Sequence, residues 1–452
     1  MHPFGEPLLG VIKALSRALD KVALKSSNSA PSEKLVKIFY NSCLQAQSGV
    51  KETERTVVER KILAIANETE NVWQFLGRIR REVNLNFKID FVTHGQYFSF
   101  SEAGKSVEEI CLAETLIHLA PATIKLYMKE VNQDVGEWRY DLIKLYRAVV
   151  AAFRFLLAGV DWLSESDREK IQQKIDDMTY SSGLPSWIDD EVKVAKEASQ
   201  YFYDSNVSIN ENYRRFRKVL FDHHLRAIVF GEEIDIALNL EENGFYNPRR
   251  NLIEVTFGFI IPGYYHVDYP LSIKYGLVGS IIGHEIMHAF DANHVTHAPH
   301  TTEEWLSERA FEGFEKRRKC FENHYALAGI SPNTFSENLA DIDGLKVAYA
   351  AYKFASQTFQ EDPPLPNIQE SHDQLFFVAY ARKFCANPNP KKVKPIHAHD
   401  AHSSRKDRVD IALQNAPVFA KAYKCAVGSR YAPLKTCSMW GDMYNPARAI
   451  IA

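Results

Sequence analysis

The residues best suited to chemistry form an H-E-x-x-H pentapeptide at positions 284–288, in the apolar context GLVGSIIGHEIMHAF. The spacing of the apolar residues predicts a helix, and residues four apart lie on one face of a helix. His284 and His288 can therefore bind a single Zn²⁺ while Glu285 lies beside the open coordination position, as in zinc hydrolases. Two helical histidines packed near a surface carboxylate would show the same pattern, so a third ligand must decide.

A third ligand is available in the segment SENLAD, where Glu337 and Asp341 are four residues apart on a second predicted helix. Catalytic zinc keeps three protein ligands and a water molecule. One carboxylate can bind the metal, while the other accepts the free ring N–H of a ligand histidine and fixes its tautomer. Such a pair is more often a solvated helix face, but two elements with matching ligands favour a site for one Zn²⁺ per chain.

The elements that must position these residues follow from two patterns along the chain. Up to about residue 230 the apolar residues recur three and four positions apart, which is typical of amphipathic helices. Beyond it, short β-rich runs separated by Asn, Gly and Pro predict a small sheet, and helices return after residue 270. We predict these later helices at 274–293, 303–328 and 335–360, with loops at 361–366 and 388–408.

These patterns predict a mainly α fold with a small β-sheet (α+β), in two domains. We expect a helical domain at 1–230 and a catalytic domain at 231–452. The stretch 181–187, SSGLPSW, is predicted to be a turn inside the helical domain.

Charge and hydropathy exclude two classes of function. The chain has 54 Lys and Arg against 57 Asp and Glu, a net charge of −3, so we expect no nucleic-acid partner. A membrane-spanning helix needs about 20 consecutive apolar residues, and the best stretch, 148–160, is shorter and contains Arg154. The N-terminus lacks the pattern of a signal peptide. We therefore expect neither a signal peptide nor a membrane span in this chain.

Five motifs in order resemble the neprilysin and endothelin-converting-enzyme family of zinc metallopeptidases. They cover residues 235–440 and read, in chain order, NGFYNP, SIKYGLVGSIIGHEIMHAFD, SENLADIDGL, DAHSSRKDR and the terminal CSMW. The resemblance implies a gluzincin catalytic domain built on the H-E-x-x-H helix, with the helical domain closing over an active-site cavity. It also implies a zinc endopeptidase that cleaves small to medium peptides, located outside the cell or at its surface.

Matched residue by residue, the resemblance implies a role for each member of the site. His284, His288 and Glu337 would bind zinc, Glu285 would be the general base, and Asp341 would orient a ligand histidine. Zinc lowers the pKa of a bound water to about 7, which suits attack on a peptide carbonyl.

The same matching assigns the groups that handle the substrate. His402 would stabilise the oxyanion, and Arg408 would contact a substrate carbonyl. Asn243 and Gly244 match an edge-strand pair that hydrogen-bonds the peptide main chain, a mode that tolerates many sequences. The pocket for the residue after the cleaved bond would be lined by Phe384 and Ile281.

Several departures from the family pattern keep an alternative open. Gly244 replaces the usual alanine, Ser336 a glycine and Ser404 a proline, and the stretch 108–161 is shorter than in the family. A catalytically weak or inactive peptide-binding homologue that has lost parts of the helical domain is therefore the second hypothesis.

The six cysteines contain no CxxC pair, which argues against a zinc ribbon or a thioredoxin-like redox site. The resemblance implies a disulfide between Cys320 and Cys437. The pairing of the others stays open; they are Cys43, Cys111, Cys385 and Cys425.

Overall fold

The computed structural model describes residues 14–23, 29–48, 107–202, 204, 207, 209–230, 243–260, 264–295, 305–359, 362–385 and 401–441. They fall into two compact units: 1–132 with 185–237, and 133–184 with 238–452. This division differs from the sequence-based domains because residues 133–184 group with the unit that carries the predicted site. Within the described ranges, no helix is long and apolar enough to cross a bilayer.

The first unit is a group of helices around an aromatic core. Rings of Phe39, His118 and Phe216 contact one another there, and a disulfide joins Cys43 to Cys111. This pairing was open from the sequence. The described helices of the unit include α2 (Pro31–Ser48), α6 (Val107–His118), α7 (Ala120–Glu130), α10 (Glu191–Ala198) and α11 (Ile209–Phe230).

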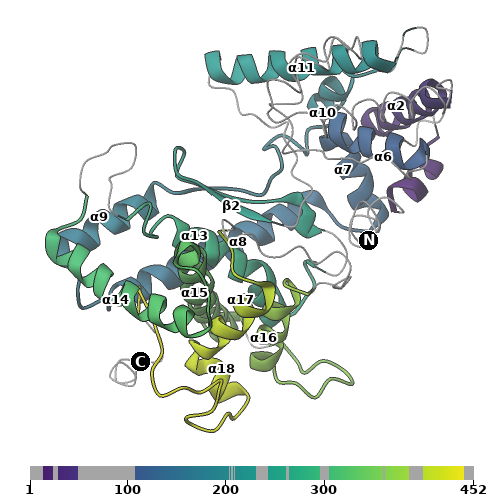
Figure 1. Cartoon of the computed structure of the whole chain (residues 1–452). Helices are drawn as coiled ribbons and strands as arrows, with labels where there is room; N and C mark the ends of the chain where they lie inside the picture. The colour runs from purple at the N-terminus through teal and green to yellow at the C-terminus, as the bar shows by residue number, and fades with distance from the viewer. Residues whose placement is uncertain are drawn as a thin grey trace, which may run out of the picture. The chain divides into compact units, whose positions relative to one another are not determined.

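The second unit contains the remaining described helices and the sheet (Figure 1). The structure thus confirms the mainly α fold with a small sheet. The α-helices are α8 (Val135–Leu157), α9 (Glu165–Asp176), α12 (Leu271–Lys274), α13 (Ser280–His288), α14 (Glu308–Leu327), α15 (Phe335–Phe359), α16 (His372–Arg382), α17 (Arg405–Gln414) and α18 (Pro417–Ala422). Short 3₁₀ segments, η1 and η3, span Phe257–Ile260 and Pro332–Thr334, and a π-helical segment, η2, spans Tyr275–Gly279.

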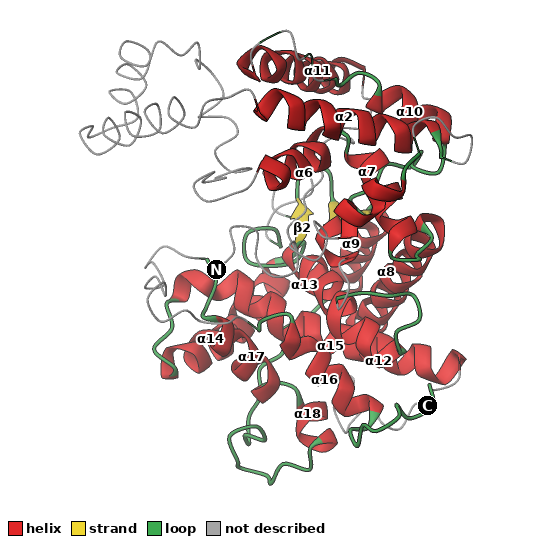
Figure 2. Cartoon of the chain, turned by 90° about the vertical axis from the view of Figure 1, so that its right-hand side faces the viewer, coloured by secondary structure: helices red, strands yellow, loops and turns green. Residues whose placement is uncertain are grey.

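The sheet has the order β1–β3–β2, so β2 (Gly244–Asn247) is an edge strand. Figure 2 shows β2 in yellow among the helices. Strand β2 pairs antiparallel with β3 (Leu252–Val255), and β1 (Thr179–Ser181) pairs parallel with β3. Strand β1 ends at Ser181, the first residue of the turn predicted at 181–187. Its pairing with β3 explains why the residues up to 184 belong to the second unit. The β-rich run predicted at 234–240 lies outside the described residues.

Helices α13 and α15 touch backbone to backbone at two glycines. A Cβ on Gly283 would lie 2.4 Å from the carbonyl oxygen of Gly344, and a Cβ on Gly344 would lie 2.6 Å from the backbone nitrogen of His284. Any larger side chain here would push the helices apart. The two glycines thus bring the first turn of α15, which carries Glu337, close to the histidines of α13.

Two predicted boundaries are wrong. The helix expected at 274–293 is three segments, α12, η2 and α13, and it ends at His288. The loop expected at 388–408 ends earlier, because α17 begins at Arg405. Ser404 caps this helix by accepting a hydrogen bond from the backbone N–H of Asp407 at 3.1 Å, a common N-terminal signal. Residues 386–400 of that loop lie outside the described residues.

Candidate metal centre

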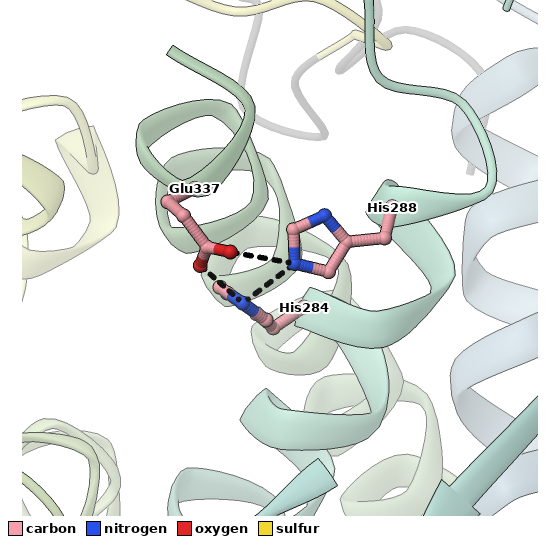
Figure 3. Close-up of side chains that lie close together, drawn as sticks. All are labelled: His284, His288 and Glu337. Atoms are coloured by element: carbon pink, nitrogen blue, oxygen red, sulfur yellow. Dashed lines mark hydrogen bonds and ion pairs between the residues drawn. The ribbon is translucent and has the colours of Figure 1, made fainter. Parts of the chain in front are cut away.

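Three side chains from α13 and α15 converge at one point (Figure 3). The Nε2 atoms of His284 and His288 are 3.1 Å apart. Glu337 Oε2 is 3.2 Å from His284 Nε2, and Glu337 Oε1 is 3.5 Å from His288 Nε2. Among the described residues, this is the only group of His, Cys, Asp and Glu side chains arranged closely enough to hold a metal ion.

The donor set fits zinc in chemistry and in spacing. Ligand atoms placed about 2.0–2.2 Å from a zinc ion in a tetrahedron lie about 3.3–3.6 Å from one another. The observed separations of 3.1–3.5 Å match this spacing closely. Burial alone would raise the pKa of Glu337, but hydrogen bonds from the imidazoles hold it well below the usual range. The carboxylate is therefore available in the ionised form that a metal requires.

Glu285 lies on the same helix with a buried side chain. Burial raises its pKa, and the nearby Glu337 adds to this effect, while the two histidines and Arg408 oppose it. A raised pKa makes the carboxylate a stronger proton acceptor, which suits a general base.

Each ligand histidine has a carboxylate at its other ring nitrogen. Asp341 Oδ1 lies 3.1 Å from Nδ1 of His284, and Asp291 Oδ2 lies 3.2 Å from Nδ1 of His288. Asp291 also contacts Nδ1 of His294 at 2.9 Å. Such carboxylates fix the ring tautomer and orientation of a metal ligand. The sequence analysis missed Asp291, although its position three residues after His288 was a usable signal.

Asp341 also binds Arg408 through two hydrogen bonds, of 2.6 Å from Nε and 2.9 Å from Nη2. Burial alone would raise the pKa of Asp341, but the guanidinium and His284 hold it well below its usual range. Arg408 Nη2 lies 3.6 Å from Glu337 as well. The arginine is thus fixed at the edge of the ligand group with its charge largely balanced.

His402, three residues before α17 begins, also lies beside the ligand group. Its Nε2 lies 3.1 Å from Glu337 Oε2, and about half of its side chain is exposed. The next residue, Ser403, donates a hydrogen bond to Asn338 Oδ1 at 2.7 Å and so ties this segment to α15. A cavity of about 390 Å³ opens beside His288 and Glu337.

Asn243 and Gly244 lie at the edge strand β2, directly over α13. A Cβ on Gly244 would lie 2.6 Å from Ile281 and 2.9 Å from Glu285. Asn243 is exposed, and its backbone N–H donates to the hydroxyl oxygen of Thr256 at 3.1 Å. Its carbonyl oxygen accepts from that hydroxyl at 2.8 Å and from the backbone N–H of Thr256 at 3.1 Å. The outer edge of β2 has no strand partner among the described residues.

Ile281 and Phe384 lie near the ligand group from two different helices. Ile281 is buried one turn before Glu285, and Phe384 follows α16, with its ring centroid 5.1 Å from the guanidinium of Arg408. The structure places Lys383 beside them, 4.9 Å from the same ring. The sequence analysis did not single out this lysine, because its neighbours in space are distant in sequence.

Comparison with known proteins shows which family this chain resembles. The model of peptidase family M13 matches residues 243–439. Neprilysin-2 of Caenorhabditis elegans is 30% identical over 334 residues, which is 71% of this chain and 44% of the relative. Membrane metallo-endopeptidase-like 1 of Mus musculus is 29% identical over 363 residues, 75% of this chain and 46% of the relative. The chain spans about half the length of these curated relatives.

Solved structures show the same fold. The zinc metalloprotease Zmp1 of Mycobacterium tuberculosis, in complex with an inhibitor, superposes with a TM-score of 0.54 at 20% identity and covers 82% of this chain and 57% of its own. PepO from Lactobacillus rhamnosis gives a TM-score of 0.55 at 20% identity, with 74% of this chain and 52% of its own covered.

Proposed function

This chain belongs to peptidase family M13, the family of neprilysin and the endothelin-converting enzymes, and from that premise we propose that it is a zinc-dependent endopeptidase acting on small to medium peptides. The observation that carries the proposal is the convergence of His284, His288 and Glu337 within 3.5 Å of one another. A buried Glu285 beside them supplies the base that hydrolysis needs.

In the proposed mechanism the three ligands would hold one Zn²⁺, which when bound would polarise the scissile carbonyl and lower the pKa of a water molecule to about 7. Glu285 accepts the proton of the attacking water on its carboxylate and passes it to the leaving amine. Its burial excludes bulk water and raises its proton affinity.

The surrounding residues position the groups that react. Asp341 and Asp291 hold His284 and His288 through their Nδ1 atoms. His402 is close enough to the ligand group to donate to the oxyanion that forms on the carbonyl oxygen. Arg408, fixed by Asp341, contributes positive charge at the same place.

The substrate is proposed to bind as an additional strand on the free edge of β2. The main chain of Gly244 and the side chain of Asn243 would bind the peptide, because the backbone of Asn243 is already bonded to Thr256. Pairing to main-chain groups gives affinity without a strict sequence requirement. Gly244 is in van der Waals reach of Glu285, so a peptide bound there lies against the base. Ile281 and Phe384 would line the pocket for the residue after the cleaved bond.

An extracellular or cell-surface location is part of the proposal. The disulfides Cys43–Cys111 and Cys320–Cys437 support it, because such bonds persist in oxidising compartments. The name of the murine relative also includes the word membrane.

The test is the zinc content and the peptidase activity of the purified chain, with Glu285→Gln as the variant. We expect about one zinc per chain in both proteins, and a loss of about 10²–10⁴-fold in kcat for the variant, since a general base contributes this much. Glu312→Gln is the matched control, because Glu312 is exposed on α14. Zinc binding without Glu285-dependent cleavage would support the alternative, a peptide-binding homologue.

A further inference from the structure

Lys383 provides an amine near the metal centre that forms no ion pair with a carboxylate of the described residues, although Asp341 and Glu285 act on it from a greater distance. Its amine donates a hydrogen bond to Ser280 Oγ at 3.2 Å. The same amine lies 4.5 Å from the ring centroid of Tyr380 and 4.9 Å from that of Phe384. Within the described ranges, no ion pair involves this lysine. Arg408, which also contacts the Phe384 ring, differs in this respect because it forms an ion pair with Asp341.

The hydrogen bonds of Ser280 leave part of this amine unsatisfied. Ser280 Oγ is 2.7 Å from the carbonyl of Gly276 and 2.9 Å from that of Leu277, so its proton is directed to the preceding turn. It therefore accepts from Lys383 and takes up one of three N–H groups. The other two have no partner among the described residues. Burial lowers the pKa of Lys383 to about 7, and the charge of Arg408 adds to this effect, while the carboxylates of Asp341 and Glu285 oppose it.

The distance of this amine from the ligands suits a neighbouring residue of the substrate. Ser280 precedes His284 by four residues, which is about 6 Å along a helix axis. An extended peptide advances about 3.3 Å per residue. The side chain of a substrate residue adjacent to the reacting carbonyl is therefore long enough to extend along α13 as far as Ser280. The Phe384 ring lies 4.9 Å from the Lys383 amine. A substrate side chain whose stem packed against Ile281 and Phe384 would therefore end close to this amine.

We propose that Lys383 binds a substrate carboxylate next to the scissile bond and so gives the enzyme a preference for acidic residues at this position. The carboxylate can belong to an aspartate or glutamate side chain or to the C-terminus of a short peptide. This inference rests on the proposed function, but it concerns the choice of substrate rather than the hydrolysis. A pocket lined only by Ile281 and Phe384 would instead favour apolar residues.

The test uses internally quenched peptides that differ only in Glu or Gln on one side of the cleaved bond, with both termini blocked. We expect kcat/KM at pH 6.5 to be about tenfold higher or more for Glu at one of the two sides, as for a charge-assisted hydrogen bond. In Lys383→Met the Glu/Gln ratio should fall to about one, and in Lys383→Arg it should persist. A second pair, with Gln and a free or amidated C-terminus, shows whether the terminal carboxylate is the group bound.

A matched control separates local binding from net charge. Lys406→Met removes an exposed lysine of α17, two residues from Arg408, and should keep the wild-type ratio. Glu/Gln ratios and free-acid/amide ratios that are equal to one in the wild type, or unchanged in Lys383→Met, would overturn the inference.

Calorimetric binding to the zinc-loaded Glu285→Gln chain gives the same ratios as dissociation constants, independently of turnover. If this chain discriminates Glu from Gln while the wild type cleaves neither peptide, the inference stands and the proposed function fails. If the wild type cleaves both peptides equally in a Glu285-dependent way and binding shows no discrimination, the proposed function stands and the inference fails.

Discussion

At the scale of single residues, two buried aspartates hold the two histidines in matching ways. Asp341 and Asp291 each face the Nδ1 atom of one ligand and leave its Nε2 directed at the metal position. Two hydrogen bonds hold the pKa of Asp291 at about 2 against the effect of its burial. The carboxylate is thus ionised at any pH at which the histidines could bind metal.

Asp291→Asn should therefore lower the zinc affinity by about 10–100-fold, which is typical when a carboxylate behind a ligand histidine is lost. The asparagine keeps the size of the side chain but neutralises the charge that stabilises the metal-bound imidazole. Competition with a chromogenic chelator measures the effect. Asp268→Asn, at an exposed position in the same unit, is the control. Equal affinities in all three proteins would show that Asp291 does not support the ligand.

The ligands could be predicted from the sequence, whereas Lys383 could not. The i, i+4 spacing of His284 and His288 fixes their common face whatever surrounds the helix. Lys383 is brought to the zinc helix by its hydrogen bond to Ser280, which is 103 residues away in sequence. Contacts of this kind depend on tertiary packing, and no local pattern reports them.

At the scale of elements, a lysine of α9 binds the C-terminal end of α13, the helix that carries the two histidine ligands. Lys174 of α9 is buried, and its amine donates to the carbonyl oxygens of Ala289 at 2.6 Å and of His294 at 3.2 Å. The last carbonyls of a helix lack partners within it, and cations are favourable there. Burial lowers the pKa of this amine to about 8.

Lys174→Met should lower the melting temperature at neutral pH, because it leaves buried carbonyls unpaired at a cost of about 1–3 kcal/mol. The pH dependence has a definite sign. In the unfolded chain a lysine titrates near about 10.4, so between pH 8 and this value the folded state binds fewer protons. Stability of the wild type should therefore rise with pH in this window relative to the variant.

Melting curves at pH 7.5, 9 and 10 measure both effects, with exposed Lys316→Met as the control. A variant as stable as the wild type at pH 7.5 would contradict the role of Lys174 at the helix end. A difference that narrows as the pH rises would contradict the sign.

The predictability of the elements follows their length. The predicted helix 335–360 matches α15 to within one residue because its apolar pattern persists over seven turns. Strand β1 has three residues, and its partner is far away, since Thr179 pairs with Leu252. The sequence around it, with Ser, Gly and Pro, indicates only a turn. The strand forms because its backbone pairs with β3.

At the scale of the whole molecule, the C-terminal segment closes the core of the second unit. Asp343 of α15 accepts hydrogen bonds from the backbone of Met439 at 2.7 Å and of Trp440 at 3.0 Å. The ring of Trp440 is buried among several aromatic rings, those of Phe153, Trp162, Phe290 and Phe314. The predicted disulfide between Cys320 and Cys437 is present and ties this segment to α14.

Removing this bond in a Cys320→Ser, Cys437→Ser double variant should destabilise the second unit by about 2–5 kcal/mol. The bond spans 117 residues, and Glu337 and Arg408 lie within this loop. Its loss increases the conformational entropy of the unfolded chain, which lowers the stability of the folded unit. Urea denaturation followed by zinc release and by tryptophan fluorescence measures the effect. Both signals should shift together, because Trp440 packs against Phe290, which follows the zinc helix closely. Cys425→Ser, which removes an unpaired thiol, should leave both midpoints in place, and an equal shift in that control would show that the disulfide contributes nothing specific.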